Sequence, residues 1–201
     1  MLPSVLVANR GEIARRVIRG CRALGIRSIA VHSEADAGWP HVADADLAVA
    51  IGPAPARESY LRIEGILDAA RRTKAAAVHP GYGFLSENWR FAQACEEAGL
   101  VFVGPPWRVI QQMGDKVGAR RLMAAAGVPV VPGSDGAVEG VEAAREAAAR
   151  IGYPLMIKAA GGGGGIGMMK VADEAGLAAA LAAGQRRAQS AFGSGALFVE
   201  R

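Results

Sequence analysis

The amino-acid sequence predicts an α/β protein in which a doubly wound, parallel-sheet domain is followed by a small α+β unit. In the first half of the 201 residues, short β-branched runs alternate with longer helical patterns. This alternation is typical of βαβ units and a parallel sheet. In the second half, the order strand, loop, strand, helix, strand predicts a smaller layered unit.

The expected elements of the first domain follow from these runs. Five strands are predicted at residues 5–8, 28–32, 47–51, 76–79 and 101–103. Three helices are predicted between them, at residues 12–24, 61–73 and 87–98. The second helix carries Ile63, Ile66, Leu67 and Ala70 at three- and four-residue spacing, so one of its faces should pack on the sheet.

The rest of the chain is expected to form a connector and a second unit. Residues 1–104 make up the first domain, residues 105–131 a helical connector with helices near 109–113 and 116–126, and residues 132–201 the second unit. Its predicted helices span residues 141–151 and 174–190. Its predicted strands are Leu155–Ala159, residues 168–171 and Leu197–Glu200.

Composition and charge narrow the functional classes. The net charge is +4, but Lys and Arg are interspersed with acidic residues, which argues against nucleic acid as a partner. The two cysteines, Cys21 and Cys95, form no CxxC pair and fall on apolar helix faces, so both are expected to be buried thiols. The first residues match neither a signal peptide nor a membrane span, so we expect no membrane partner. A cytoplasmic protein is therefore expected, or a mitochondrial matrix protein if the source is eukaryotic.

The motif ANRGEIA, residues 8–14, joins the first predicted strand to the first helix. It has one glycine, Gly11, where a dinucleotide-binding GxGxxG turn needs three, and no P-loop occurs in the chain. Arg10 is interpreted as part of a solvated turn. Glu12 is interpreted as a residue at the start of the helix, where an acidic side chain is favourable.

A run of five glycines, Gly161–Gly165, follows Lys158 at the end of a predicted strand. Such backbone can approach a ligand closely, and its N–H groups together with the lysine could bind phosphate oxygens. A surface hairpin without a ligand is the alternative.

Lys116 in MGDKVGAR follows Asp115, a predicted helix N-cap, and by itself would be interpreted as a surface lysine.

The motif AVHPGYGFLSEN, residues 77–88, lies where ligands bind in open α/β sheets, after the carboxyl end of a strand. Gly81 and Gly83 flank Tyr82 and allow the backbone to present its ring. Ser86 is predicted to cap the next helix, and His79 is interpreted as a hydrogen-bonded structural residue.

Taken together and in this order, ANRGEIA, VHPGYGFLSEN, MGDKVGAR, VPGSDG and IKAAGGGGG resemble the biotin carboxylase family over essentially the whole chain. HPGYGFLSEN is specific to that family. The lysine and glycine loop alone would indicate only the broader ATP-grasp superfamily, which includes carbamoyl-phosphate synthetase.

The resemblance implies a pre-ATP-grasp domain followed by an ATP-grasp lid subdomain, and it implies roles for individual residues. The residues implied to bind ATP are Lys116, Lys158, Gly164, Gly165 and Glu200. Glu200 would begin the hinge that holds adenine. Tyr82 and Gly83 are implied to border the biotin and bicarbonate site. Many relatives carry Arg or Lys where this chain has Ile166.

The implied activity is that of an ATP-dependent ligase. ATP phosphorylates bicarbonate to carboxyphosphate, and a biotin ureido nitrogen then takes the carboxyl group. The Mg²⁺ ligands and the catalytic base are implied to lie beyond residue 201, so no catalytic or metal residue is assigned in this chain, which is expected to be an incomplete portion and inactive alone.

The implied partners are a biotin carboxyl carrier protein or domain, a carboxyltransferase subunit and a second copy of the full-length chain in a homodimer. The whole enzyme would be an acetyl-CoA, propionyl-CoA or methylcrotonyl-CoA carboxylase. Similar chains also lead pyruvate carboxylases, and the sequence does not decide whether the final acceptor is an acyl-CoA or a keto acid. Two alternatives stay open: another ATP-grasp ligase, such as a carbamoyl-phosphate synthetase, and a structural or dimerisation fragment without turnover.

Overall fold

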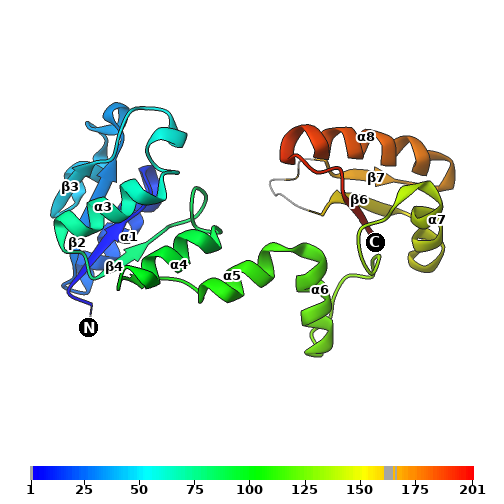
Figure 1. Cartoon of the computed structure of the whole chain (residues 1–201), viewed down its shortest axis with the longest axis horizontal. Helices are drawn as coiled ribbons and strands as arrows, with labels where there is room; N and C mark the ends of the chain where they lie inside the picture. The colour runs from blue at the N-terminus through cyan, green and yellow to red at the C-terminus, as the bar shows by residue number, and fades with distance from the viewer. Residues whose placement is uncertain (1, 161–164, 166) are drawn as a thin grey trace. The chain divides into compact units, whose positions relative to one another are not determined.

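The computed structural model describes residues 2–160, 165 and 167–201 (Figure 1). The chain divides into two compact units, Met1–Gln111 and Gln112–Arg201. The first unit has a hydrophobic core on each face of its sheet, and the second unit has a separate core.

The first unit is built on a parallel sheet. Its strands are β1 (Ser4–Val7), β2 (Arg27–His32), β3 (Leu47–Ala50), β4 (Ala77–His79) and β5 (Val101–Phe102). They lie in the order β3-β2-β1-β4-β5, and every neighbouring pair is parallel. This confirms the predicted doubly wound fold. The strand order reverses between β1 and β4, and ligands of such sheets bind outside the carboxyl ends of the strands at that point.

Helices cover both faces of this sheet. Val5 and Val7 of β1 pack with Ile18 of α1 (Gly11–Ala23) on one face. Leu6 faces the other way and belongs to the core that includes residues of α3 (Ile63–Thr73) and α4 (Trp89–Glu97). Alternation of side chains along a strand explains why one strand serves both cores. A short helix, α2 (Pro40–Asp44), and 3₁₀ turns at Glu34–Asp36 and Ala56–Glu58 complete the unit.

Both cysteines are buried, as the sequence predicted. Cys21 lies in the core under α1, and Cys95 in the core under α4. Burial raises the pKa of Cys95 to about 12. The Cys95 thiol therefore stays protonated at physiological pH, as expected of a packing residue.

The helix caps follow the sequence prediction in one case and depart from it in the other. Asp115 caps α6 (Lys116–Ala125) by accepting hydrogen bonds from the N–H groups of Val117 and Gly118, as predicted. The prediction for Ser86 is wrong, because Asn88 caps α4. The N–H of Ser86 donates to the Gly83 carbonyl, so residue 86 lies inside a turn before the helix begins.

The second unit is a small antiparallel sheet with helices packed against it. Strands β6 (Leu155–Ala159), β7 (Met169–Val171) and β8 (Leu197–Glu200) lie in the order β7-β6-β8, and both pairs are antiparallel. The helices are α6 (Lys116–Ala125), α7 (Gly140–Ile151) and α8 (Glu174–Phe192), and α5 (Trp107–Gly114) precedes them. Leu155 and Ile157 of β6 share a core with residues of α7 and α8. Lys158 lies between Ile157 and Ala159, which both belong to this core, and it points to the opposite face of the strand because side chains alternate.

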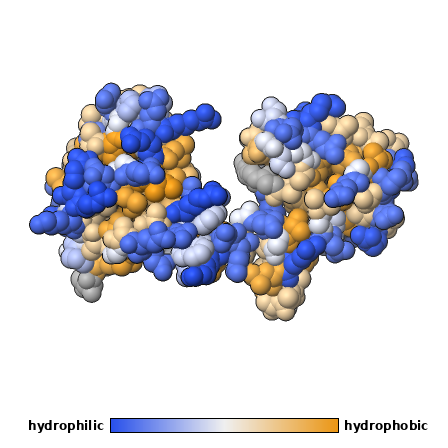
Figure 2. Space-filling model, viewed as in Figure 1, coloured by the Kyte–Doolittle hydropathy of each residue, from blue (hydrophilic) through white to orange (hydrophobic). Residues whose placement is uncertain are grey.

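The surface of each unit mixes hydrophilic residues with apolar patches on the face drawn in Figure 2. None of the helices in the described ranges combines the length and the apolar character needed to cross a membrane.

Candidate functional site

The carboxyl ends of β1 and β4 bring two of the sequence motifs together. The N–H of Ala8 donates to the His79 carbonyl over 2.9 Å, which extends the pairing of β1 and β4 to the edge of the sheet. The turn of residues 9–12 and the loop of residues 80–84 therefore leave the sheet side by side. They occupy the point where the strand order reverses, the expected ligand position in this fold.

Asn9 fastens the turn to the loop. Its side chain is buried, and its Nδ2 donates to the carbonyl oxygens of Pro80 and Tyr82, each over 2.8 Å. Its Oδ1 accepts from the N–H of Arg10 at 2.9 Å. Gly81 has a φ of +66°, and a Cβ there would lie 2.8 Å from Asn9 Nδ2. The loop is thus packed so tightly on Asn9 that only glycine fits at residue 81.

Tyr82 and Gly83, the residues implied to border the biotin and bicarbonate site, lie at the exposed side of this loop. Tyr82 is 60% exposed, and its hydroxyl donates to the carboxylate of Glu12 at the start of α1. That hydrogen bond raises the pKa of Tyr82. Gly83 has a φ of +68° and open space where a Cβ would stand.

His79 is a hydrogen-bonded histidine at the end of β4, as the sequence predicted. Its Nδ1 lies 3.0 Å from the N–H of Gly81, which donates to it. Burial lowers its pKa, so the ring is neutral at physiological pH and its Nδ1 can accept this bond. His79 therefore supports the loop.

Two glycines of this loop offer a matched test of its packing. Gly83→Ala should lower the free energy of unfolding by about 1 kcal/mol, because its φ disfavours a Cβ. Gly81→Ala carries the same backbone cost and also a clash with Asn9, so we expect a loss of about 3 kcal/mol. Urea denaturation of the chain measures both. An equal loss of unfolding free energy in Gly81→Ala and Gly83→Ala would show that the Asn9 side chain can move away from a Cβ at residue 81 without cost.

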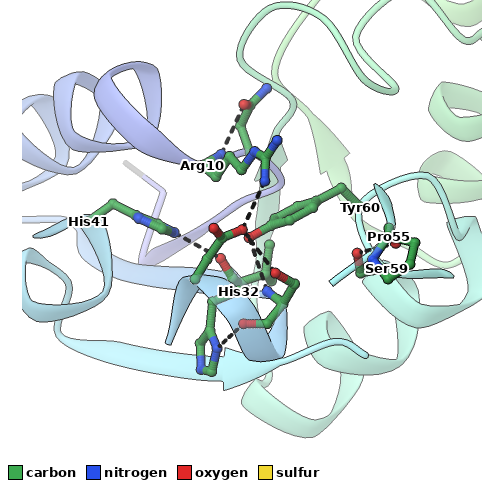
Figure 3. A network of polar contacts seen from close by, with 10 residues as sticks. Arg10, His32, His41, Pro55, Ser59 and Tyr60 are labelled. Atoms are coloured by element: carbon green, nitrogen blue, oxygen red, sulfur yellow. Dashed lines mark hydrogen bonds and ion pairs between the residues drawn. The ribbon is translucent and has the colours of Figure 1, made fainter. Parts of the chain in front are cut away.

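Arg10 is held by a buried carboxylate (Figure 3). Its Nη1 lies 3.1 Å from Asp36 Oδ2, an oxygen that also accepts from the Tyr60 hydroxyl at 2.7 Å and the Ser33 hydroxyl at 2.9 Å. Burial alone would raise the pKa of Asp36, but the hydrogen bonds from Tyr60, Ser33 and Arg10 outweigh it and hold that pKa below its ordinary value. Burial, with the hydrogen bond to Asp36, raises the pKa of Tyr60 to about 12.

The guanidinium of Arg10 also lies near aromatic rings. Its Cζ is 5.3 Å from the centroid of Tyr60, 5.5 Å from that of Phe84 and 5.9 Å from that of Trp39. The Tyr60 and Phe84 rings stack at 5.0 Å with an interplanar angle of 5°. The interpretation of Arg10 as part of a solvated turn is correct only in part, because 39% of its side chain is exposed but a carboxylate and aromatic rings distant in sequence also contact its guanidinium.

In the second unit, two residues implied to bind ATP form an ion pair. Lys158 lies near the end of β6 and Glu200 at the end of the adjacent β8, and the Lys158 Nζ contacts Glu200 Oε1. The Lys158 side chain is 25% exposed and that of Glu200 is 13% exposed. The pair therefore keeps an oriented, partly accessible cation on the sheet face opposite α7 and α8.

Lys116 is the first residue of α6, behind the Asp115 cap. One turn further on, Arg120 Nη1 donates to the Ser134 carbonyl at 2.9 Å. The N–H of Ser134 in turn donates to the Val199 carbonyl of β8 at 2.7 Å. Arg120 thus ties α6 to the strand that carries Glu200, a role that no local sequence signal indicated.

The glycine run lies largely outside the described residues, which include neither Gly164 nor Ile166. Gly165 is described and has a φ of +76°, a conformation that L side chains rarely adopt. Among the described residues, no group of three or more His, Cys, Asp or Glu side chains is arranged to hold a metal ion.

Comparison with known families covers both units. Residues 1–110 match the family described as biotin carboxylase, N-terminal domain, and residues 115–201 match the ATP binding domain of the carbamoyl-phosphate synthase L chain. The chain belongs to the biotin carboxylase family. This confirms the family that the motifs indicated.

Individual relatives agree with this assignment. A biotin carboxylase of Halalkalibacterium halodurans is 52% identical over 201 residues, which are 100% of this chain and 44% of the relative. The mitochondrial methylcrotonoyl-CoA carboxylase subunit alpha of Oryza sativa is 53% identical over 197 residues, 98% of this chain and 27% of the relative. The chain spans less than half the length of these relatives.

Solved biotin carboxylase structures share the fold. A Campylobacter jejuni biotin carboxylase in complex with a β,γ-ATP ligand matches with a TM-score of 0.94 and 45% identity, covering 100% of this chain and 45% of its own. The biotin carboxylase domain dimer of Hydrogenobacter thermophilus 2-oxoglutarate carboxylase, in complex with MgADP, ADP and bicarbonate, matches with a TM-score of 0.92 and 48% identity. The match covers 100% of this chain and 44% of the chain in that structure.

Proposed function

We propose that the protein to which this chain belongs is the biotin carboxylase component of a biotin-dependent acyl-CoA carboxylase. It would use ATP and bicarbonate to carboxylate biotin on a carrier protein, through carboxyphosphate. The observation that carries the proposal is that one chain unites both family regions, each with a candidate site. Tyr82 and Gly83 lie at the strand-order reversal of the first, and Lys158 and Glu200 are paired in the second.

Within the second unit, we assign ATP binding to Lys116, Lys158, Gly165 and Glu200, together with Gly164 from outside the described residues. ATP supplies the phosphoryl group that activates bicarbonate. The chemistry of these residues fits a triphosphate, since a lysine ammonium is a compact positive charge and glycine backbone can bring N–H groups close to phosphate oxygens. Partial exposure of Lys158 leaves its ammonium accessible, and Glu200 orients it from the adjacent strand.

Mg²⁺ would be held elsewhere. The described residues offer no suitable cluster of ligands, so we derive no step through Mg²⁺ from them. We assign its ligands to the part of the protein beyond residue 201. The functional division we propose is residues 1–104 as pre-ATP-grasp domain, 105–131 as connector and 132–201 as lid subdomain.

We assign Tyr82 and Gly83 to the biotin and bicarbonate side of the site. The proposed partners are a biotin carboxyl carrier protein or domain, a carboxyltransferase subunit and a second copy of the full-length protein. The dimer of the Hydrogenobacter thermophilus domain supports the last of these. The relatives named above are bacterial and mitochondrial, which supports a cytoplasmic or mitochondrial matrix protein.

The test is an assay of the full-length protein for incorporation of labelled bicarbonate into free biotin, with ATP and Mg²⁺. We expect label in carboxybiotin and phosphate release that depends on biotin. The match of residues 115–201 to a carbamoyl-phosphate synthase domain makes a second ligase activity worth testing in the same assay. ATP consumption that depends on ammonia, with no label in biotin, would replace our proposal with that activity.

A further inference from the structure

The turn that follows β1 holds the Tyr82 loop at three separate points. The motif ANRGEIA, residues 8–14, supplies Asn9, Arg10 and Glu12, and each of these contacts a different part of the loop. We propose that Asn9, Arg10 and Glu12 are positioning residues that fix the Tyr82 and Gly83 loop for the carboxylation of biotin. The inference rests on the proposed role of that loop.

The first point of attachment is the loop backbone. Asn9 Nδ2 donates to two carbonyl oxygens, those of Pro80 and Tyr82, so it fixes the peptide units before and after Gly81. The amide is buried and its Oδ1 is occupied by the N–H of Arg10, which leaves the side chain one orientation. An acceptor at the position of Nδ2 would face two carbonyl oxygens and push the loop away.

The second point is the ring of Phe84, beyond Gly83. Phe84 has a φ of +43°, an uncommon conformation for a residue with a side chain, and its ring stacks on Tyr60. The guanidinium of Arg10 lies 5.5 Å from the Phe84 centroid and is itself fixed by Asp36 (Figure 3). The guanidinium of Arg10, which follows β1, therefore links the far end of the loop to Asp36 in the segment after β2.

The third point is the side chain that faces solvent. Tyr82 is 60% exposed, so packing alone does not fix its ring. The Glu12 carboxylate accepts a hydrogen bond from its hydroxyl and sets the ring's direction. Because the loop contains two glycines with positive φ, such contacts reduce the conformational entropy that substrate binding would otherwise have to overcome.

The experiment uses the full-length protein and free biotin as substrate. Asn9→Asp, Arg10→Lys and Glu12→Ala should each lower kcat/KM for biotin by about 100-fold, the loss that a misplacement of about 1 Å can cause. The KM for ATP should stay unchanged. Arg10→Lys keeps the charge beside Asp36 but loses the flat guanidinium that lies by the rings. Glu12→Gln should retain near wild-type kinetics, because its amide oxygen can still accept from Tyr82.

The matched control is Asp46→Asn. Asp46 also accepts hydrogen bonds, from the N–H and the hydroxyl of Ser28, but it lies near the amino ends of the strands, away from the loop. It should destabilise the first unit without altering the biotin kinetics. Hydrogen exchange at the amides of residues 81–86 provides a second readout, which should accelerate in Asn9→Asp and not in Asp46→Asn.

Two results separate this inference from the proposed function. Biotin kinetics and loop exchange that match the Asp46→Asn control in all three variants would overturn the positioning role while the wild-type enzyme stays a biotin carboxylase. A wild-type protein without biotin-dependent carboxylation would instead refute the proposed function and with it the catalytic part of the inference. The exchange comparison would then still show whether the turn fixes the loop.

Discussion

In the full-length protein, Lys158→Ala is expected to lower ATP-dependent carboxylation of free biotin by about 100-fold, the typical loss when one fixed donor to developing negative charge is removed. The ammonium lies near the end of β6, and its contact with Glu200 fixes its position before any substrate binds. The variant should remain folded, because Lys158 lies on the sheet face opposite the core that contains Leu155 and Ile157. Steady-state kinetics and circular dichroism measure the two effects.

Lys170→Ala is the control for this substitution. Lys170 is exposed on β7, which pairs with the other edge of β6, so the variant loses the same charge from the same sheet. Its turnover should remain close to that of the wild type. Equal turnover in Lys158→Ala and the wild type would show that Lys158 does not belong to the ATP site.

Local patterns were sufficient to predict the fold class and all the strands, but not every helix. Every strand of the first unit ends within one residue of its predicted position, because short apolar runs bounded by turn residues mark buried strands. In the second unit, β6 and β8 have the predicted bounds. The short helix α2 was missed, since five residues beginning with a proline carry no periodic signal.

The same local patterns could not predict which residues distant in sequence contact one another. Arg10 was interpreted as solvated, because nothing in ANRGEIA reveals that Asp36 and Tyr60 converge on its guanidinium. Residues 158 and 200 were each implied by the resemblance, but their pairing depends on the antiparallel register of β6 and β8. A motif thus indicates which residue types a site needs, while the fold decides what each side chain contacts.

The 201-residue chain by itself is expected to bind ATP weakly and to show neither bicarbonate-stimulated ATP hydrolysis nor carboxylation of biotin. It covers 44% of the Halalkalibacterium halodurans relative and 45% of the Campylobacter jejuni structure. We have proposed that the Mg²⁺ ligands lie outside it, and the family resemblance implies the same of the catalytic base. Lysines alone neutralise a triphosphate only in part, and without a positioned nucleophile the phosphoryl group has no acceptor.

The measurement is phosphate release by the purified chain and by the full-length enzyme, each with and without bicarbonate, after urea denaturation has shown that the chain is folded. We expect stimulation only in the full-length enzyme. ATP that bound to the chain would also lack contacts from the rest of the protein to offset its lost translational and rotational freedom, and this weakens binding further. Clear bicarbonate-stimulated turnover by the chain would contradict this expectation, because it would place a sufficient set of catalytic groups among residues 1–201.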